Sequence, residues 1–134
     1  FQAKGCASCH AGELITDGTF RYNGLQPTQI NDLGRAKITE LAADNYKFKV
    51  PSLRNIEVTR PYMHDGRFFD LEMVLNHYTE RVLDGPTLDP IFRQNSKPGI
   101  ALTDVEKKQL VAFLKTLTDR KFLTNPKFAE PPTR

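Results

Sequence analysis

Two cysteines, Cys6 and Cys9, stand three positions apart near the start of the sequence, and a histidine, His10, follows directly. They are the only cysteines of the chain, and their spacing is too short to staple distant parts of a fold. Two thiols separated by two residues can reach the two vinyl groups on one edge of a porphyrin, and the next histidine then lies beneath the iron. The motif therefore predicts one covalently attached haem c, with thioethers at Cys6 and Cys9 and His10 as proximal ligand.

Two other uses of paired cysteines compete with this interpretation. A zinc site would need two more Cys or His ligands at matching spacing, and only His64 and His77 remain. A thioredoxin-like dithiol would need alternating strands and helices, which the sequence does not indicate. Because haem c is attached outside the cytoplasm in bacteria, the haem interpretation also predicts a periplasmic protein.

Size and charge limit the organisation and the partners. At 134 residues with 39% apolar residues, the chain fits one domain, 1–134, with one modest core. Its 19 basic and 16 acidic residues are scattered without a run of like charge, so we expect no nucleic-acid partner. No apolar stretch is long enough for a membrane span or a retained signal peptide. The motif begins so early that we expect further chain before it.

Much of the sequence predicts irregular chain. Residues 11–45 are rich in Gly, Asn, Asp and Thr, which is typical of a long loop around a cofactor. Residues 47–67 contain Pro51 and Pro61 and should be extended or turning. No alternation lasts long enough to predict a sheet. The proline-rich tail from Asn125 should lie along the surface.

Two segments predict helices. Asp70 can cap a helix whose apolar residues recur at i, i+3, i+4 and i+7 from Leu71 to Tyr78. A second helix begins with the capping box of Thr103 and Glu106 and should end near Thr118. Its inward side chains should be Val105, Leu110, Phe113, Leu114 and Leu117. The predicted class is mainly α, a cytochrome c-like haem domain with long irregular loops.

The sixth iron ligand decides the chemistry, because Met raises the reduction potential, whereas an open position permits ligand binding. Four residues compete for this role: Met63, Met73, His77 and Tyr78. In the structural interpretation the methionines fill gaps in the core, His77 is a surface histidine and Tyr78 packs on the apolar face. The residues alone leave this choice open.

The segment from Phe48 to Arg67 resembles the bacterial di-haem cytochrome c peroxidases and their relatives, including the methylamine-utilisation enzyme that matures a tryptophan-derived quinone. The Cys-x-x-Cys-His motif, Asp32-Leu-Gly-Arg35, the helix at 71–78 and the closing Ala112 to Leu117 share this resemblance. Enzymes of this family have two haem domains, and the chain resembles the C-terminal one. The resemblance therefore implies a partner outside this chain, the N-terminal haem domain of the same enzyme.

The resemblance also implies a distal ligand. In the family this ligand is Met in the peroxidases and Tyr in the quinone-maturing branch, and the matching residue is Tyr78. Met63 stands where the peroxidases commonly have Phe. The resemblance therefore favours Tyr78 over Met63 and His77, and a phenolate would lower the reduction potential relative to a thioether.

Further site residues follow from the same resemblance. The family holds calcium between its haem domains with backbone carbonyls that match Thr59 and Pro61, and with a side chain from the N-terminal half. Two carbonyls alone make a weak site, so we expect calcium only when both halves are present. His64 is expected near the haem propionates, and Arg54 and Arg67 could pair with them.

The expected function is that of the electron-transfer half of a di-haem cytochrome c peroxidase-like oxidoreductase, which reduces hydrogen peroxide to water. In the family peroxide reacts at the N-terminal haem, so no catalytic residue is assigned in this chain. A small redox protein would donate electrons, and a homodimer is a further arrangement to consider. The alternatives are a free-standing electron-transfer cytochrome c, which would favour Met63, and a di-haem oxidase of protein side chains, which would favour Tyr78.

Overall fold

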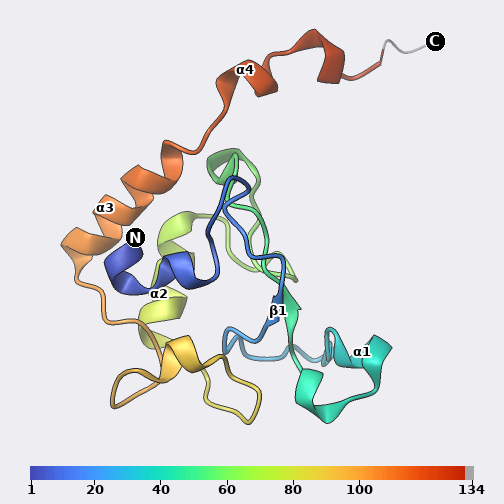
Figure 1. The fold of residues 1–134 in the computed structure, drawn as a ribbon, viewed down its shortest axis with the longest axis vertical. Coiled ribbons are helices and arrows are strands. Elements are labelled where there is room, and N and C mark those ends of the chain that lie inside the picture. Colours follow the sequence, from blue (N-terminus) through green and yellow to red (C-terminus); the bar gives the residue numbers. More distant parts are fainter. Residues whose placement is uncertain (132–134) are drawn as a thin grey trace.

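The computed structural model describes residues 1–131, in which helices are connected by long loops (Figure 1). The α-helices are α1 (Ala36–Thr39), α2 (Leu71–Glu80), α3 (Asp104–Lys115) and α4 (Arg120–Leu123). Strands β1 (Phe20–Arg21) and β2 (Phe48–Lys49) form an antiparallel pair. Short 3-10 helices are η1 (Gln2–Lys4), η2 (Cys6–Ser8), η3 (Ala42–Asp44), η4 (Ile56–Val58), η5 (Pro90–Arg93) and η6 (Pro126–Phe128).

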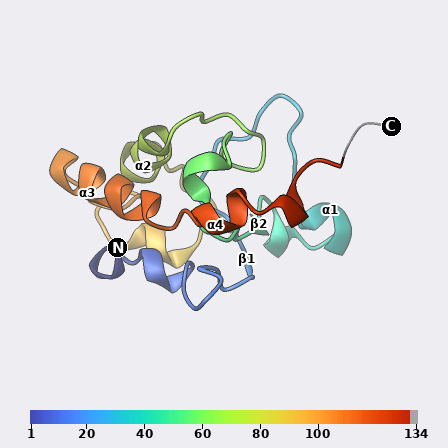
Figure 2. The same cartoon turned by 90° about the horizontal axis from the view of Figure 1, so that it is seen from above.

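The two predicted helices form as expected, and both begin at the predicted caps. The Asp70 carboxylate accepts a hydrogen bond of 2.7 Å from the backbone N–H of Met73, which starts α2. Thr103 and Glu106 make the reciprocal capping box of α3. The two helices pack against each other, with the N-terminal η1 beside them (Figures 1 and 2).

The inward face of α3 is narrower than predicted. Leu110 and Leu114 are buried, but Val105 is 65% exposed, so its assignment to the core was wrong. It lies in the first turn of α3. Phe113 is 40% exposed, so its inward assignment was also wrong, and its ring packs at a tilt of 44° on Phe1, with centroids 4.9 Å apart.

Buried apolar residues gather in two separate clusters. The helical cluster consists of Leu53, Ile56, Tyr62, Leu71 and Leu114. The loop cluster consists of Tyr22, Val82, Leu88 and Phe92, with Tyr46, Tyr78, Ile91 and Ile100 packed against it. Leu71 at the start of α2 belongs to the first and Tyr78 near its end to the second, so one helix joins the clusters.

The loops carry more regular structure than predicted. β1 and β2 lie within segments expected to be irregular, and the Phe20–Lys49 and Arg21–Phe48 pairs join them. Strands of two residues are too short to show alternation, so no sequence pattern could reveal them. The short helix α1 also lies within the expected loop.

After α3 the chain leaves the body, and α4 and η6 extend beyond it (Figure 1). There the rings of Phe122 and Phe128 pack together with centroids 4.9 Å apart. The tail prediction covers residues from Asn125, of which 132–134 lie outside the described part. Among residues 1–131, no helix is long and apolar enough to cross a membrane.

Candidate haem-binding site

The two cysteines flank one turn of 3-10 helix. η2 begins at Cys6 and ends before Cys9, whose N–H donates to the Cys6 carbonyl at 3.3 Å. Gly5 turns the chain into η2 with a positive φ of 77°, and a Cβ on it would lie 2.7 Å from the Ile91 side chain. The turn therefore places both thiols on one short rigid segment, beside η5.

His10 is oriented by the backbone that follows it. Its Nδ1 lies 3.3 Å from the Ile15 carbonyl oxygen, which can only accept, so Nδ1 carries the hydrogen. This leaves Nε2 as the atom with a lone pair for a metal, the second-sphere arrangement common to metal-binding histidines. Burial lowers the pKa of His10, against the effect of the Ile15 and Pro51 carbonyls. The neutral imidazole is the form that binds iron.

The thiols lack the features of a reactive dithiol. Burial raises the pKa of both Cys6 and Cys9, whereas redox-active cysteines have lowered values. Within residues 1–131, no group of three His, Cys, Asp or Glu side chains is placed to hold a metal ion. Both thiols are free and only partly exposed.

An ion-pair network lies beside Cys9 and was not anticipated from the sequence. The Arg21 guanidinium donates to Asp17 at 2.7 Å and to Asp89 at 2.6 Å. All three side chains affect the pKa of the Cys9 thiol, so they are its electrostatic neighbours. The network joins the loop after the Cys-x-x-Cys-His motif, strand β1 and the start of η5.

Tyr78 lies on the face of α2 that turns towards η5. Its ring stacks on Phe92 of η5, with centroids 5.5 Å apart and planes at 19°. Burial raises the pKa of the Tyr78 hydroxyl, a neighbouring Asn23 side chain lowers it, and the charges of Cys9 and Cys6 raise it further. The hydroxyl therefore lies within electrostatic reach of both thiols.

His77 is the most buried polar side chain among the described residues, at 2% exposure, so the interpretation as a surface histidine was wrong. It lies three positions after Val74, on the flank of the apolar face. Its Nε2 lies 3.0 Å from the backbone carbonyl of Asn23, and its ring packs on Phe68 and Tyr78.

The two methionines differ in placement. Met63 sits at a positive φ of 71° in the turn before α2, and its sulfur accepts a 3.4 Å hydrogen bond from the Asn23 side-chain amide. Met73 is 45% exposed on the solvent side of α2. Of the four candidate ligands, Met63, His77 and Tyr78 meet around Asn23, and Met73 does not.

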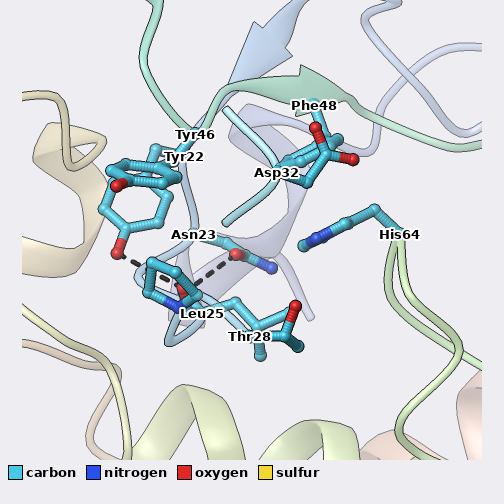
Figure 3. A pocket seen from close by; sticks show the side chains of 9 residues that line it. Tyr22, Asn23, Leu25, Thr28, Asp32, Tyr46, Phe48 and His64 are labelled. Atoms are coloured by element: carbon cyan, nitrogen blue, oxygen red, sulfur yellow. Dashed lines mark hydrogen bonds between the residues drawn. The ribbon is translucent and has the colours of Figure 1, made fainter. Parts of the chain in front are cut away.

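The residues expected near the propionates have partners within the chain. His64 stacks on Phe48 with ring centroids 3.6 Å apart, in a small pocket that also contains Asn23 and Asp32 (Figure 3). Burial lowers the pKa of His64. Arg54 donates to the Glu13 carbonyl at 2.9 Å, and Arg67 pairs with Asp65.

Thr59 and Pro61, the calcium residues implied by the resemblance, lie in an exposed turn after η4. The Arg60–Pro61 peptide bond is cis. Their place at the surface is compatible with a partner domain that would supply the remaining ligands, and the calcium assignment stays a prediction.

Comparison with known proteins identifies the kind of haem protein. No family model matches the chain. It is 42% identical over 115 residues to methylamine utilization protein MauG of Methylorubrum extorquens, which covers 84% of this chain and 31% of that protein. It is 35% identical over 121 residues to cytochrome c551 peroxidase of Nitrosomonas europaea, covering 88% of this chain and 32% of the relative.

A solved structure agrees with these relatives. A MauG-like protein associated with microbial copper homeostasis superposes with a TM-score of 0.75 at 34% identity, covering 94% of this chain and 46% of that chain. The chain belongs to the di-haem cytochrome c peroxidase and MauG family. The diheme peroxidase BthA from Burkholderia thailandensis shares the fold at 24% identity, with a TM-score of 0.67.

Membership in this peroxidase and MauG family implies haem c, and the donor set fits it. Two free thiols three positions apart, a histidine oriented by a backbone carbonyl and a partly buried tyrosine on α2 are the kinds of group that attach a haem and bind its iron. The chain spans about a third of the length of the curated relatives it matches.

Proposed function

We propose that this chain is the electron-transfer haem domain of a periplasmic di-haem cytochrome c peroxidase-like enzyme. Cys6 and Cys9 would hold the haem, and His10 and Tyr78 would bind its iron from opposite faces. The observation that carries the proposal is the stacking of Tyr78 on Phe92 of η5, the element that packs against Gly5 before the two cysteines and the oriented His10. When bound, the haem supplies one-electron redox chemistry.

The division of labour follows the resemblance. Peroxide would react in the N-terminal haem domain, which corresponds to sequence outside this chain. The exposed turn at Thr59 and Pro61 would hold calcium with that domain, and a small redox protein would deliver electrons. His64, Arg54 and Arg67 would lie towards the propionate side, where Arg54 and Arg67 keep partners of their own.

A second candidate is an oxidase of protein side chains in the manner of MauG. It is favoured by Tyr rather than Met at position 78 and by the 42% identity to a MauG protein. A free-standing electron carrier is less well supported, because the Met63 sulfur that it would need is hydrogen-bonded to Asn23.

Haem attachment is tested on denatured holoprotein. The thioethers survive unfolding, so the haem stain should stay with the polypeptide on a denaturing gel. The Cys6→Ala/Cys9→Ala protein should lose the stain entirely. Complete extraction of haem from the unmutated chain by acid-acetone would refute the proposal.

The distal ligand is tested with Tyr78→Phe, which removes one oxygen and keeps the ring stacked on Phe92. The holoprotein should change its ferric absorption spectrum and bind cyanide faster. Tyr62→Phe is the matched control, because Tyr62 is also buried but donates its hydroxyl to the Ile56 carbonyl at 2.7 Å in the helical cluster. A spectral change in Met63→Leu but not in Tyr78→Phe would move the assignment to Met63.

The two enzyme candidates differ in their substrates. Joined to an N-terminal haem domain, the peroxidase should oxidise a reduced cytochrome in the presence of peroxide. The side-chain oxidase should instead accept electrons from a protein substrate and be slow with the cytochrome. This chain alone should show little turnover with peroxide, and rates equal to those of the two-domain protein would contradict the proposed division of labour.

A further inference from the structure

Two of the four candidate distal ligands, Met63 and His77, are hydrogen-bonded to one residue, Asn23, which follows strand β1. Its side-chain amide donates to the Met63 sulfur at 3.4 Å. Its backbone carbonyl accepts from His77 Nε2 at 3.0 Å. The Asn23 side chain also neighbours the Tyr78 hydroxyl and lowers its pKa. The first contact occupies the Met63 sulfur, the atom with which it would bind a metal, and the second occupies one of the two ring nitrogens of His77.

The His77 contact determines which nitrogen carries the hydrogen. A carbonyl oxygen can only accept, so Nε2 carries the hydrogen and the lone pair of the neutral ring lies on Nδ1. The ring is also held on two sides by Phe68 and Tyr78, with centroid distances of 5.9 Å and 5.4 Å. His77 is thus fixed as a donor to the Asn23 segment.

The Met63 contact depends on the orientation of the Asn23 amide, which a second hydrogen bond fixes. The Leu25 N–H donates to Asn23 Oδ1 at 3.2 Å, so the other side-chain atom must be the nitrogen that faces the Met63 sulfur. Figure 3 shows Asn23 at the centre of the residues that line the small pocket, with its Leu25 contact dashed.

The backbone around Asn23 is hydrogen-bonded to the segment that follows α2. Gly24 has a positive φ of 70°, and its carbonyl accepts from the Leu83 N–H at 2.9 Å. A Cβ at Gly24 would lie 2.4 Å from the Val82 side chain, so only glycine fits this approach. The Tyr22 carbonyl accepts from the Asp89 N–H at 3.0 Å. Asn23 is therefore held in place from both sides.

We propose that Asn23 selects the distal ligand by holding Met63 and His77 in hydrogen bonds, which leaves the distal face of the haem to Tyr78. The inference rests on the proposed function, since it requires Tyr78 to bind the iron. Asn23 is a positioning residue, because it acts on the ligands and not on the iron.

Asn23→Asp separates the two contacts. It keeps the oxygen that accepts from Leu25 and the backbone carbonyl that accepts from His77, and it replaces the amide nitrogen that donates to Met63 with an oxygen. In holoprotein the released thioether should compete with Tyr78, most strongly for ferrous iron, which thioethers favour. We expect an approximately fivefold rise in the Met-ligated fraction. This fold-change corresponds to the net free energy of one ordinary hydrogen bond, here the lost bond to Met63.

The readouts are the near-infrared charge-transfer band of Met-ligated ferric haem and the midpoint potential. The released sulfur should raise the potential, whereas the added carboxylate alone would lower it, so the two effects have opposite sign. Asn23→Asp/Met63→Leu should lose the band and fall below the unmutated protein in potential. Asn23→Ser, which is neutral and too short to reach Met63, should reproduce the band, and it serves if the aspartate variant does not fold.

Two results would overturn the inference. If neither Asn23 variant shows the band or a raised potential while Tyr78→Phe still alters the spectrum, Asn23 does not select the ligand and the proposed function stands. If Tyr78→Phe leaves the spectrum unchanged, Tyr78 is not the ligand, and both the selection by Asn23 and the ligand assignment fall together.

Discussion

The helical and loop clusters differ in what holds them together. In the helical cluster, Leu71 of α2 and Leu114 of α3 pack with side chains from the segment before α2, and side-chain caps at Asp70 and Thr103 fix where the two helices begin. The loop cluster gathers aromatic side chains from segments with little regular structure, such as Tyr22, Tyr46 and Phe92. Under the proposed function, Tyr78, which packs against this cluster, binds the haem iron. The helical cluster is then a core that the chain supplies alone, whereas the loop cluster would be completed by a cofactor.

This difference between the two clusters predicts that loss of haem destabilises the loop cluster far more than the helical cluster. In Cys6→Ala/Cys9→Ala protein, the amides of residues 15–50 and 82–100 should lose most of their protection from hydrogen exchange. The amides of α2 and α3 should keep theirs, because their packing involves few of the haem-facing residues. Equal loss of protection in both regions would show that the clusters form one cooperative unit.

A truncation in the helical cluster should have the next largest effect. Leu114→Ala removes a buried side chain between α3 and η4 and should lower the free energy of unfolding by about 2–5 kcal/mol. Chemical denaturation of the holoprotein measures this. Val105→Ala is the matched control on the same helix, since its exposed side chain should cost little. A comparable cost for both would contradict the assigned inward face.

The caps give a smaller and more local effect. Thr103→Ala removes the hydroxyl that accepts from the Glu106 N–H at 3.3 Å and should cost about 1 kcal/mol in unfolding free energy. Thr116→Ala, near the other end of α3, serves as the control, because its hydroxyl donates to a carbonyl within the last turn. The haem spectrum should be unchanged in both, since α3 does not carry a proposed ligand.

The smallest expected effect is the pH dependence of the contact between η1 and α3. The Lys4 ammonium lies 2.8 Å from Glu106 and, with the Thr103 backbone, lowers the pKa of that carboxyl to about 2. Because the folded value is below the ordinary one, the pair stabilises the fold above the ordinary pKa of a glutamate and is lost as the pH falls towards the folded value. Glu106→Gln keeps the cap geometry and removes the charge.

The thermal midpoint should therefore differ between the Glu106→Gln and unmutated proteins at neutral pH and converge near pH 2. About 1 M salt should shrink the neutral-pH difference, because the partners are partly exposed. A difference that is independent of pH would assign the effect to the cap and not to the ion pair.

Sequence reasoning correctly predicted features that depend only on residues close together in the sequence. The caps of α2 and α3 and the attachment motif are local patterns, and the structure confirms the two helix starts. Sequence reasoning could not find β1 and β2, which are too short to carry a pattern. It also missed the Arg21 network, because Asp89 is 68 positions away from Arg21 in the sequence. The Asn23-Gly24 dipeptide does signal a turn, but its contacts with Met63 and His77 arise only from the tertiary fold.

The burial of His77 is a second feature that depends on tertiary contacts and could not be predicted from the sequence. A histidine on the flank of an amphipathic helix is exposed or buried according to what packs there, and here the Asn23 segment covers it. Val105 is the opposite case, an apolar residue at a suitable helical position whose side chain is 65% exposed. Periodicity identifies a face, and the width of that face depends on the neighbours.

The placement of α2 across both clusters has a consequence for how such a protein can change over time. Leu71 anchors the helix in the helical cluster, and Tyr78 lies two turns further on, at the end that faces the loops. Under the proposed function, a new side chain at position 78 would change the ligand of the iron and leave the Leu71 anchor of the helix in place. Related chains could therefore differ in reduction potential while they keep the same helical cluster.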